Sequence, residues 1–153
     1  MQLEASLSFQ ITACGNLLRQ LTAQQIKSAG IDLTPEESVL LNQLWKNDDQ
    51  PLSELARWAV KGPSTVTRQI DGLVKKGYVE RVQGSEDRRQ IFAKLTPAGK
   101  KIRAKFLKAD VPNLDKCLPV MDDKDYAKTL QTIATIRQHL IGLLHGVSEK
   151  NGS

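Results

Sequence analysis

Between Leu52 and Gly99 the sequence places two short helices, joined by a tight turn, in front of two strands, and few folds accommodate that order. The first helix begins with the amphipathic segment 52–56 and ends at the turn 60–62. Pro63 suits the first position of the second helix, and Gly77 suits the position just after its end. The stretch therefore predicts a helix-turn-helix.

Both helices of this pair carry an apolar stripe. In the second helix the spacing i, i+4, i+7 and i+8 is that of a single buried face, formed by Val66, Ile70, Leu73 and Val74. In the first helix the residues expected to pack inward are Leu52, Leu55, Ala56 and Trp58. The polar residues of the second helix fall on its other faces.

A hairpin follows the two helices. Residues 78–82 and 90–95 alternate apolar and polar side chains, as strands with one buried face do. The polar, charged segment 84–88 between them is a turn, so the two strands form a hairpin, or wing. Thr96 suits the N-cap of a further helix that has Pro97 in its first turn.

Longer helices are expected on both sides of this region. Apolar residues at three- and four-residue steps predict a helix over residues 3–29, which Gly30 ends. Thr34, with Pro next and Glu three residues later, begins a second helix that ends in the turn cluster 47–49. Asp122 opens the last helix, whose apolar residues repeat along one side.

The element order predicts a mainly α fold with a small β-hairpin wing, in which a winged helix-turn-helix domain carries long N- and C-terminal dimerisation helices. The segment 111–113, Val-Pro-Asn, is expected to break or bend the fifth helix. The apolar stripes of the terminal helices exceed what a small winged domain covers, which favours a homodimer over packing within one chain. The expected division is an N-terminal dimerisation helix at 1–30, the winged domain at 31–105, C-terminal dimerisation helices at 106–147 and a flexible tail at 148–153.

Positive charge is concentrated in the middle of the chain. Residues 57–103 contain twelve Lys and Arg against four Asp and Glu, a net charge of +8, whereas the other residues contain ten against thirteen, a net charge of −3. A localised basic segment suits a polyanion such as double-stranded DNA. Charge alone favours an ordinary solvated face, and it is the helix-turn-helix and the wing that favour DNA.

The second helix of the pair supplies side chains that suit the base edges of a major groove. Ser64, Thr65 and Thr67 have short hydroxyl side chains that allow a close approach. Arg68 can reach guanine or a phosphate, and Lys75 adds a further cation on the polar side of the helix. Many helices outside DNA-binding proteins also begin with Ser and Thr, so these residues indicate DNA without requiring it.

The end of the wing contains Asp87, Arg88 and Arg89. The negative potential of a narrow minor groove attracts an arginine side chain. The Asp87 carboxylate is unusual in a DNA-binding loop, and it can hydrogen-bond a guanidinium and fix the direction of that side chain. The alternative is an exposed Asp–Arg pair that contributes little.

Taken together, these segments resemble the MarR family of winged helix-turn-helix transcriptional regulators. The chain is similar to the family's DxR…LT..G signature at Asp87-Arg88-Arg89, Leu95-Thr96 and Gly99. Residues 64–73 and 76–81 resemble its recognition helix and first wing strand. Residues 54–56 resemble the helix before the recognition helix, and residues 33–35 resemble the start of the family's second helix. The similarity covers roughly residues 30–105. The family usually has Gly near position 60, where this chain has Val60.

The resemblance implies a homodimer joined by its terminal helices, in which each recognition helix and wing meets one half of a palindromic operator. The residues that it places at the major groove are Ser64, Thr65, Thr67 and Arg68. In the wing it pairs Asp87 with Arg89 and places Arg89 in the minor groove. Family members commonly repress genes. They often release DNA when a small aromatic or anionic effector binds between the dimer helices and the DNA-binding lobe.

The two cysteines leave another regulator open. One subgroup of the family, the organic-hydroperoxide sensors, uses a reactive cysteine in its first helix, sometimes with a second cysteine on the other subunit. Here Cys14 lies in the first helix and Cys117 precedes the last. That subgroup surrounds its cysteine with aromatic residues, whereas here only Arg19, about one turn away, is placed to lower the pKa of the thiol. The alternative is two free thiols in a reducing compartment.

Other functions have little support in the sequence. It contains no motif for a catalytic nucleophile or a nucleotide, and His139 and His145 do not have the spacing of a metal site on a helix, so no enzyme, cofactor or metal is expected. A winged helix used only for protein contacts is the remaining alternative, and it would not require the basic centre or the wing pair. No apolar run has the length of a membrane span and no targeting segment is seen, so a cytoplasmic, nucleoid-associated protein is expected.

Overall fold

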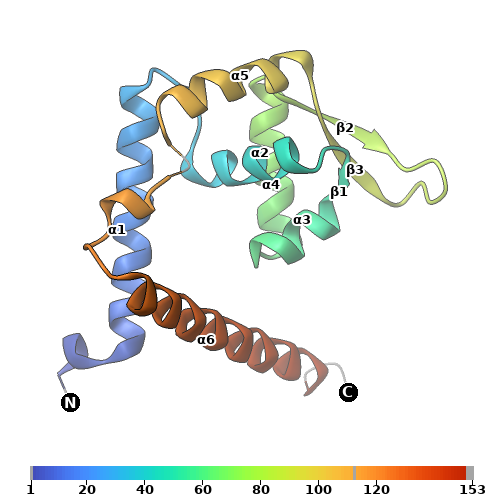
Figure 1. Cartoon of the computed structure of the whole chain (residues 1–153). Coiled ribbons are helices and arrows are strands. Elements are labelled where there is room, and N and C mark those ends of the chain that lie inside the picture. Colours follow the sequence, from blue (N-terminus) through green and yellow to red (C-terminus); the bar gives the residue numbers. More distant parts are fainter. Residues whose placement is uncertain (1, 112, 151–153) are drawn as a thin grey trace. The chain divides into compact units, whose positions relative to one another are not determined.

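The computed structural model describes residues 2–111 and 113–150, with side chains described up to residue 146 (Figure 1). The chain divides into two compact units, Met1–Leu114 and Asp115–Ser153. Among the described residues, the first unit contains the 3-10 turn η1 (Leu3–Ala5) and the helices α1 (Leu7–Ser28), α2 (Pro35–Lys46), α3 (Leu52–Ala59), α4 (Pro63–Lys75) and α5 (Pro97–Lys108). Its strands are β1 (Gln50–Pro51), β2 (Val79–Gln83) and β3 (Ile91–Leu95), and the second unit contains η2 (Asp115–Cys117) and α6 (Asp123–Lys150).

This is the mainly helical, winged helix-turn-helix fold that the element order predicts. The three strands form an antiparallel sheet in the order β1-β3-β2. The hairpin of β2 and β3 extends away from the helices and forms the wing (Figure 1). In the wing Arg81 pairs with Ala93 and Glu80 pairs with Lys94, so Arg81 and Lys94 lie on opposite faces of the hairpin.

Local capping signals fix most helix ends where the sequence predicts them. At the start of α2, Thr34 Oγ1 accepts a hydrogen bond from Glu37 N at 3.1 Å, and a Glu37 carboxylate oxygen accepts one from Thr34 N at 3.0 Å, which completes a capping box. Thr96 caps α5 by accepting a hydrogen bond from Gly99 N. Gly30, with a φ of 66°, follows the end of α1, and Gly77, with a φ of 80°, follows the end of α4.

The structure differs from the sequence prediction at several points. The short strand β1 was not predicted, because two residues have no periodicity and pair only through contact with β3. Trp58 is 46% exposed and Val74 is also exposed, against the prediction that both pack inward. α1 begins at Leu7, and α6 continues to Lys150, into the segment predicted as a tail.

Trp58 and Val74 are exposed because the buried face of each helix, α3 and α4, is narrow. Four residues of α3 at i, i+3, i+4 and i+7 already fill its inner face, namely Leu52, Leu55, Ala56 and Ala59. Trp58 falls outside that set, and Val74 lies at the edge of the stripe of α4 in its last turn. The predicted break of α5 includes Pro112, which lies outside the described residues, and α5 itself ends at Lys108.

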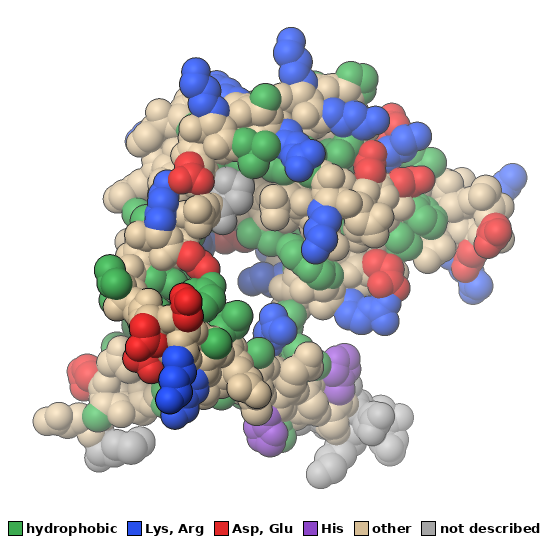
Figure 2. All heavy atoms as spheres, in the orientation of Figure 1, with side chains coloured by type: hydrophobic (Ala, Val, Ile, Leu, Met, Phe, Trp, Pro, Cys, Tyr) green, Lys and Arg blue, Asp and Glu red, His purple; other side chains and the backbone are tan. Residues whose placement is uncertain are grey.

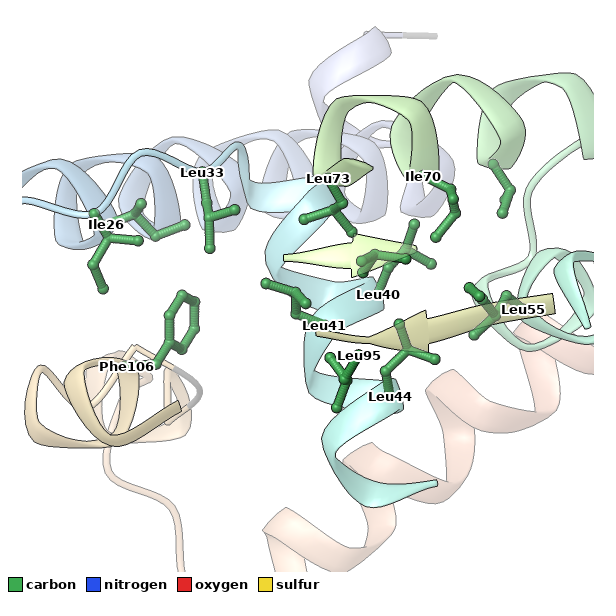
Figure 3. Close-up of a cluster of buried hydrophobic side chains, with 14 of the residues drawn as sticks. Ile26, Leu33, Leu40, Leu41, Leu44, Leu55, Ile70, Leu73, Leu95 and Phe106 are labelled. Atoms are coloured by element: carbon green, nitrogen blue, oxygen red, sulfur yellow. The ribbon is translucent and has the colours of Figure 1, made fainter. Parts of the chain in front are cut away.

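The core of the first unit is formed by one buried residue or more from every element except η1 and β1. Figure 3 shows Leu40, Leu41 and Leu44 of α2 at its centre, with Ile70 and Leu73 of α4 and Leu55 of α3 around them. A second part of the core joins α1 to α5, where Phe106 is directed toward Ile26 (Figure 3). The ring of Trp45 packs edge-on against Phe106 with ring centroids 5.3 Å apart. The helix-turn-helix is thus held on a continuous apolar base.

Val60 adopts a left-handed backbone conformation in the turn between α3 and α4, with φ 55° and ψ 47°. The family that the sequence resembles usually has a glycine near this position. A β-branched residue is strained there because its Cβ crowds the backbone. The turn keeps the geometry that a glycine would give it, at a cost in stability.

We therefore expect Val60→Gly to raise the free energy of unfolding by about 1 kcal/mol. Glycine relieves the backbone strain of the folded turn, and this gain is larger than the loss from the greater conformational entropy of glycine in the unfolded chain. Urea unfolding followed by circular dichroism at one fixed protein concentration measures the change. Val60→Ala is the matched control, because alanine removes the branched side chain and keeps the Cβ. A variant Val60→Gly that is less stable than the wild type would show that the turn is not strained.

Candidate nucleic-acid interface

The polar side of α4 is presented to solvent. Val66, Ile70 and Leu73 are fully buried and fix the rotation of the helix about its axis. As a result Ser64, Arg68 and Lys75 are exposed, and Thr65 and Thr67 are half-buried. No side chain caps the N-terminus of α4, where Gly62 is the N-cap residue. The first two turns of α4 therefore offer hydroxyl groups and an arginine, and its N-terminus offers the backbone N–H groups after Pro63, a combination that suits DNA.

A buried carboxylate lies beneath the other end of α4. The side chain of Glu37 is only 8% exposed, and one of its carboxylate oxygens lies 2.7 Å from the Nζ of Lys76, whose side chain is 25% exposed. Lys76 Nζ also lies 3.8 Å from Asp32. Gly72 makes room for the carboxylate, since a Cβ at that position would lie less than 3.0 Å from Glu37 Oε1. This contact fixes the distance between α4 and α2.

The wing holds its arginine as the sequence predicts. Asp87 Oδ1 accepts hydrogen bonds from Arg89 N at 3.0 Å and from Arg89 Nε at 3.3 Å. The tip is also closed by a bond from Gly84 N to Gln90 O and by one from Gln83 Nε2 to Arg88 O. The Arg89 side chain is 92% exposed, and Figure 2 shows acidic and basic side chains together at the end of the wing. The carboxylate thus restricts a side chain that otherwise moves freely in solvent.

The sequence analysis did not predict that Arg81 lies between the wing and α4. Arg81 Nη1 donates a hydrogen bond to Asp71 Oδ1 at 2.7 Å, which links β2 of the wing to α4. The strand pattern held a signal, because Arg81 stands two residues after the buried Val79 and so falls on the inner face of the wing. A cation on that face needs a partner, and Asp71 is one of the four acids in the basic segment.

A groove of about 480 Å³ lies between α1, α2 and the helix-turn-helix turn. Arg19 and Glu36 form a two-pronged ion pair in it, in which Arg19 Nη2 lies 3.2 Å from Glu36 Oε2 and Arg19 Nε bonds Oε1. The hydrogen bonds from Arg19 hold the pKa of the Glu36 carboxyl below its ordinary value, against the opposing effect of partial burial. Lys61 also lines the groove, on the turn between α3 and α4. We call this the α1–α2 groove.

The structure places the two cysteines in different units. Cys14 is exposed on α1, and Cys117 is exposed at the end of η2. Arg19, which the sequence offered as a neighbour of Cys14, bonds Glu36. Near Cys117, Tyr126 donates a hydrogen bond to Asp115 Oδ2 at 2.5 Å, and that bond raises the pKa of the tyrosine.

Over the residues described, no helix combines the length and the hydropathy that a bilayer span requires. In the same part of the chain, no three His, Cys, Asp or Glu side chains gather as metal ligands would.

Comparison with known proteins places this geometry in a family. The MarR family model matches residues 33–91, from the start of α2 to the first residue of β3. The uncharacterized HTH-type transcriptional regulator YhbI of Bacillus subtilis is 29% identical over 122 residues, which are 80% of this chain and 77% of YhbI. The HTH-type transcriptional repressor YetL of the same organism is 30% identical over 99 residues, 63% of this chain and 59% of YetL.

A solved structure extends the similarity to most of the chain. AbfR of Staphylococcus epidermidis, in its reduced form bound to DNA, covers 94% of this chain and 96% of its own with a TM-score of 0.75 and 26% identity. AbfR has also been solved overoxidized on DNA and with a disulfide formed. The fold, the wing signature and these relatives agree, and the relatives are regulators rather than enzymes. Residues 33–91 of this chain therefore belong to the MarR family of winged helix-turn-helix transcriptional regulators, and over most of its length the chain is similar to a relative solved on DNA.

Proposed function

We propose that this regulator is a repressor that binds a palindromic operator as a homodimer and leaves it when a small ligand binds. The observation that carries the proposal is that one compact unit presents two elements whose exposed side chains suit DNA. The polar face of α4 is held by Val66, Ile70 and Leu73, and the wing presents an arginine held by Asp87. A helix of this kind suits the major groove, and a directed arginine suits the minor groove. YetL supports the repressor assignment by similarity.

The proposed dimer rests on apolar residues that both units expose. Leu3, Leu7 and Leu17 are each more than 60% exposed in η1 and α1. In α6 the exposed apolar residues include Leu130, Ile133, Leu140 and Leu143. Terminal helices with such stripes are covered in a two-fold dimer, and two-fold symmetry matches a palindromic site. Sedimentation equilibrium tests this directly, and a monomer at micromolar concentration would contradict it.

The first test of DNA binding is fluorescence anisotropy with DNA from upstream of the protein's own gene and with a scrambled duplex, at two salt concentrations. The wild type should prefer the first duplex, and its affinity should fall as salt rises. Arg89→Ala should weaken that binding. Arg88→Ala is the comparison within the wing. Arg88 is also predicted to contact DNA, but the contacts with Asp87 are described for Arg89, so Arg88→Ala should weaken binding less. Equal, weak binding of the wild type to both duplexes would count against a regulator that acts at this site.

Arg68→Ala is expected to reduce operator affinity by roughly 1–3 kcal/mol and to relax the preference at one base step. The reason is the exposed position of Arg68 on the polar face of α4, where its guanidinium can bond two acceptors of one guanine. A panel of duplexes with single base changes measures the effect. Equal losses on every duplex, including the scrambled one, would make Arg68 a phosphate contact instead.

The ligand is proposed to bind in the α1–α2 groove. The volume of about 480 Å³ suits a small molecule, and Arg19 and Lys61 favour an anionic group there. Lys61 belongs to the helix-turn-helix turn, so a ligand that contacts it acts on the start of α4. Benzoate is a suitable probe by calorimetry. Binding that Arg19→Gln does not weaken would place the ligand elsewhere.

A second candidate is redox control through Cys14, and the AbfR structures favour it. That relative has been solved reduced, overoxidized and with a disulfide, and here both cysteines are exposed. A hydroperoxide would oxidise the Cys14 thiolate to a sulfenic acid and be reduced to the alcohol. Attack by the Cys117 thiol of a second copy would then form a disulfide and release water. Peroxide that releases DNA from the wild type and equally from Cys14→Ser would exclude this mechanism.

A further inference from the structure

In the proposed complex with DNA, one strand of the duplex passes between α4 and the wing. The proposed function puts α4 in a major groove and the wing tip in the neighbouring minor groove, and the inference that follows rests on it. The sugar–phosphate strand that separates the two grooves of a duplex must then cross the surface between these elements. Any side chains there meet phosphate and not base edges.

A groove of about 420 Å³ lies at this place. Its walls come from three elements that are distant in sequence: Ser53 at the start of α3, Thr67 of α4, and Arg81 and Arg89 of the wing. Hydroxyl and guanidinium groups are among the side-chain groups that commonly contact DNA phosphates. We call it the α4–wing groove.

Arg81 enters this groove from the inner face of the wing. It shares that face with Val79 and Ala93, which are buried in the core. Arg81 lies directly opposite Ala93 on that face, but its side chain is 38% exposed and donates a hydrogen bond to Asp71 of α4 at 2.7 Å. A guanidinium has five N–H donors in a fixed plane, so one bond to Asp71 fixes its direction and leaves donors for a second acceptor.

We propose that Arg81 binds a phosphate of the DNA backbone in the α4–wing groove, and that Asp71 is the residue that positions it. The Ser53 and Thr67 hydroxyls complete the same phosphate site. In this arrangement Thr67 contributes to affinity rather than to base selection. Asp71 and Asp87 then have equivalent tasks, since each carboxylate holds one arginine on either side of the strand.

The negative charge of Asp71 allows a test between two roles, a carboxylate that only repels DNA and a residue that positions Arg81. A carboxylate on a surface that meets a polyanion is repelled by it, so its removal should strengthen binding to every duplex. A positioning residue has the opposite effect on the correct site, because its removal releases Arg81 from the phosphate. The sign of the change in affinity therefore separates the two descriptions.

The experiment uses full-length protein and a duplex that the wild type enriches from a random library, with a scrambled duplex for comparison. Affinities are measured by anisotropy over a series of salt concentrations for the wild type, Arg81→Gln, Asp71→Ala and the double variant. Lys94→Gln is the matched control, because it removes the same charge from the opposite face of the same hairpin. Circular dichroism melting confirms that each variant is folded.

We expect Arg81→Gln to weaken both duplexes by about tenfold and to reduce the slope of log affinity against log salt by about 0.9. Asp71→Ala, which removes the acceptor, should weaken the enriched duplex, and it should not weaken either duplex in the Arg81→Gln background, where no arginine is left to position. Lys94→Gln should change affinity less than Arg81→Gln does.

Other outcomes would overturn the inference. If Arg81→Gln is folded and keeps the wild-type affinities and salt slope, Arg81 does not bind phosphate. If Asp71→Ala binds both duplexes more tightly, Asp71 is only a repulsive charge and does not position Arg81. If the wild type enriches no sequence, the proposed function fails, and this result is distinct from a failure of either variant.

Discussion

Glu37→Ala is expected to lower the free energy of unfolding by about 3 kcal/mol. The substitution leaves the ammonium group of Lys76 mostly buried, with Asp32 at 3.8 Å as its remaining carboxylate neighbour among the ion pairs described. It also removes the acceptor for Thr34 N, and so half of the capping box that begins α2. Urea unfolding at fixed protein concentration measures the loss.

Two further variants separate the causes. Glu37→Gln keeps an oxygen that can accept from Thr34 N, so its loss should be smaller than that of Glu37→Ala. The double variant Glu37→Met and Lys76→Met removes both charges and fills the space with apolar atoms, and it should recover much of the stability. If the double variant is as unstable as Glu37→Ala, the unpaired charge is not the main cause.

Gly99→Ala should cost about 3 kcal/mol or more, at the upper end of the range for overpacking. A Cβ at position 99 would lie less than 3.0 Å from the backbone oxygen of Tyr78. A backbone atom cannot relieve such a clash by changing rotamer, as a side chain can. The same oxygen accepts a hydrogen bond from Thr96 N at 3.1 Å, and Gly99 O accepts one from Trp45 Nε1 at 2.8 Å. Displacement of α5 would therefore strain two further contacts.

Gly15→Ala is the matched control for this prediction. Gly15 also lies in a helix, and a Cβ there meets nothing within 4 Å. Alanine should stabilise an open helical position by up to about 1 kcal/mol. Thermal melting of both variants is sufficient to compare them. If Gly99→Ala retains wild-type stability, the close approach of α5 to Tyr78 is not a constraint on the fold.

The features that the sequence predicted well are those with local causes. The capping box at Thr34, the Thr96 cap and the glycines after α1 and α4 depend on residues within one turn of each other. The Asp87–Arg89 pair also spans only two residues at a turn, but it was the resemblance to the family that predicted it. Chemistry that is close in sequence is close in space whatever the rest of the fold does.

The features that the sequence did not predict depend on contacts between distant segments. Glu37 and Lys76 are 39 residues apart and meet only because α4 crosses α2. Arg81 and Asp71 come together because the strand after α4 turns back beside it. The exposure of Trp58 depended on how many residues the inner face of α3 can hold. Each required the packing of whole elements, which periodicity does not supply.

The two tryptophans of this chain give it an internal optical reporter. Trp45 packs against Phe106 and donates a hydrogen bond to Gly99 O, whereas Trp58 is 46% exposed near the end of α3, two residues before the strained turn at Val60. A dissolved quencher such as acrylamide will reach Trp58 first. Emission from one indole thus follows the integrity of the core, and emission from the other follows the turn that leads into α4.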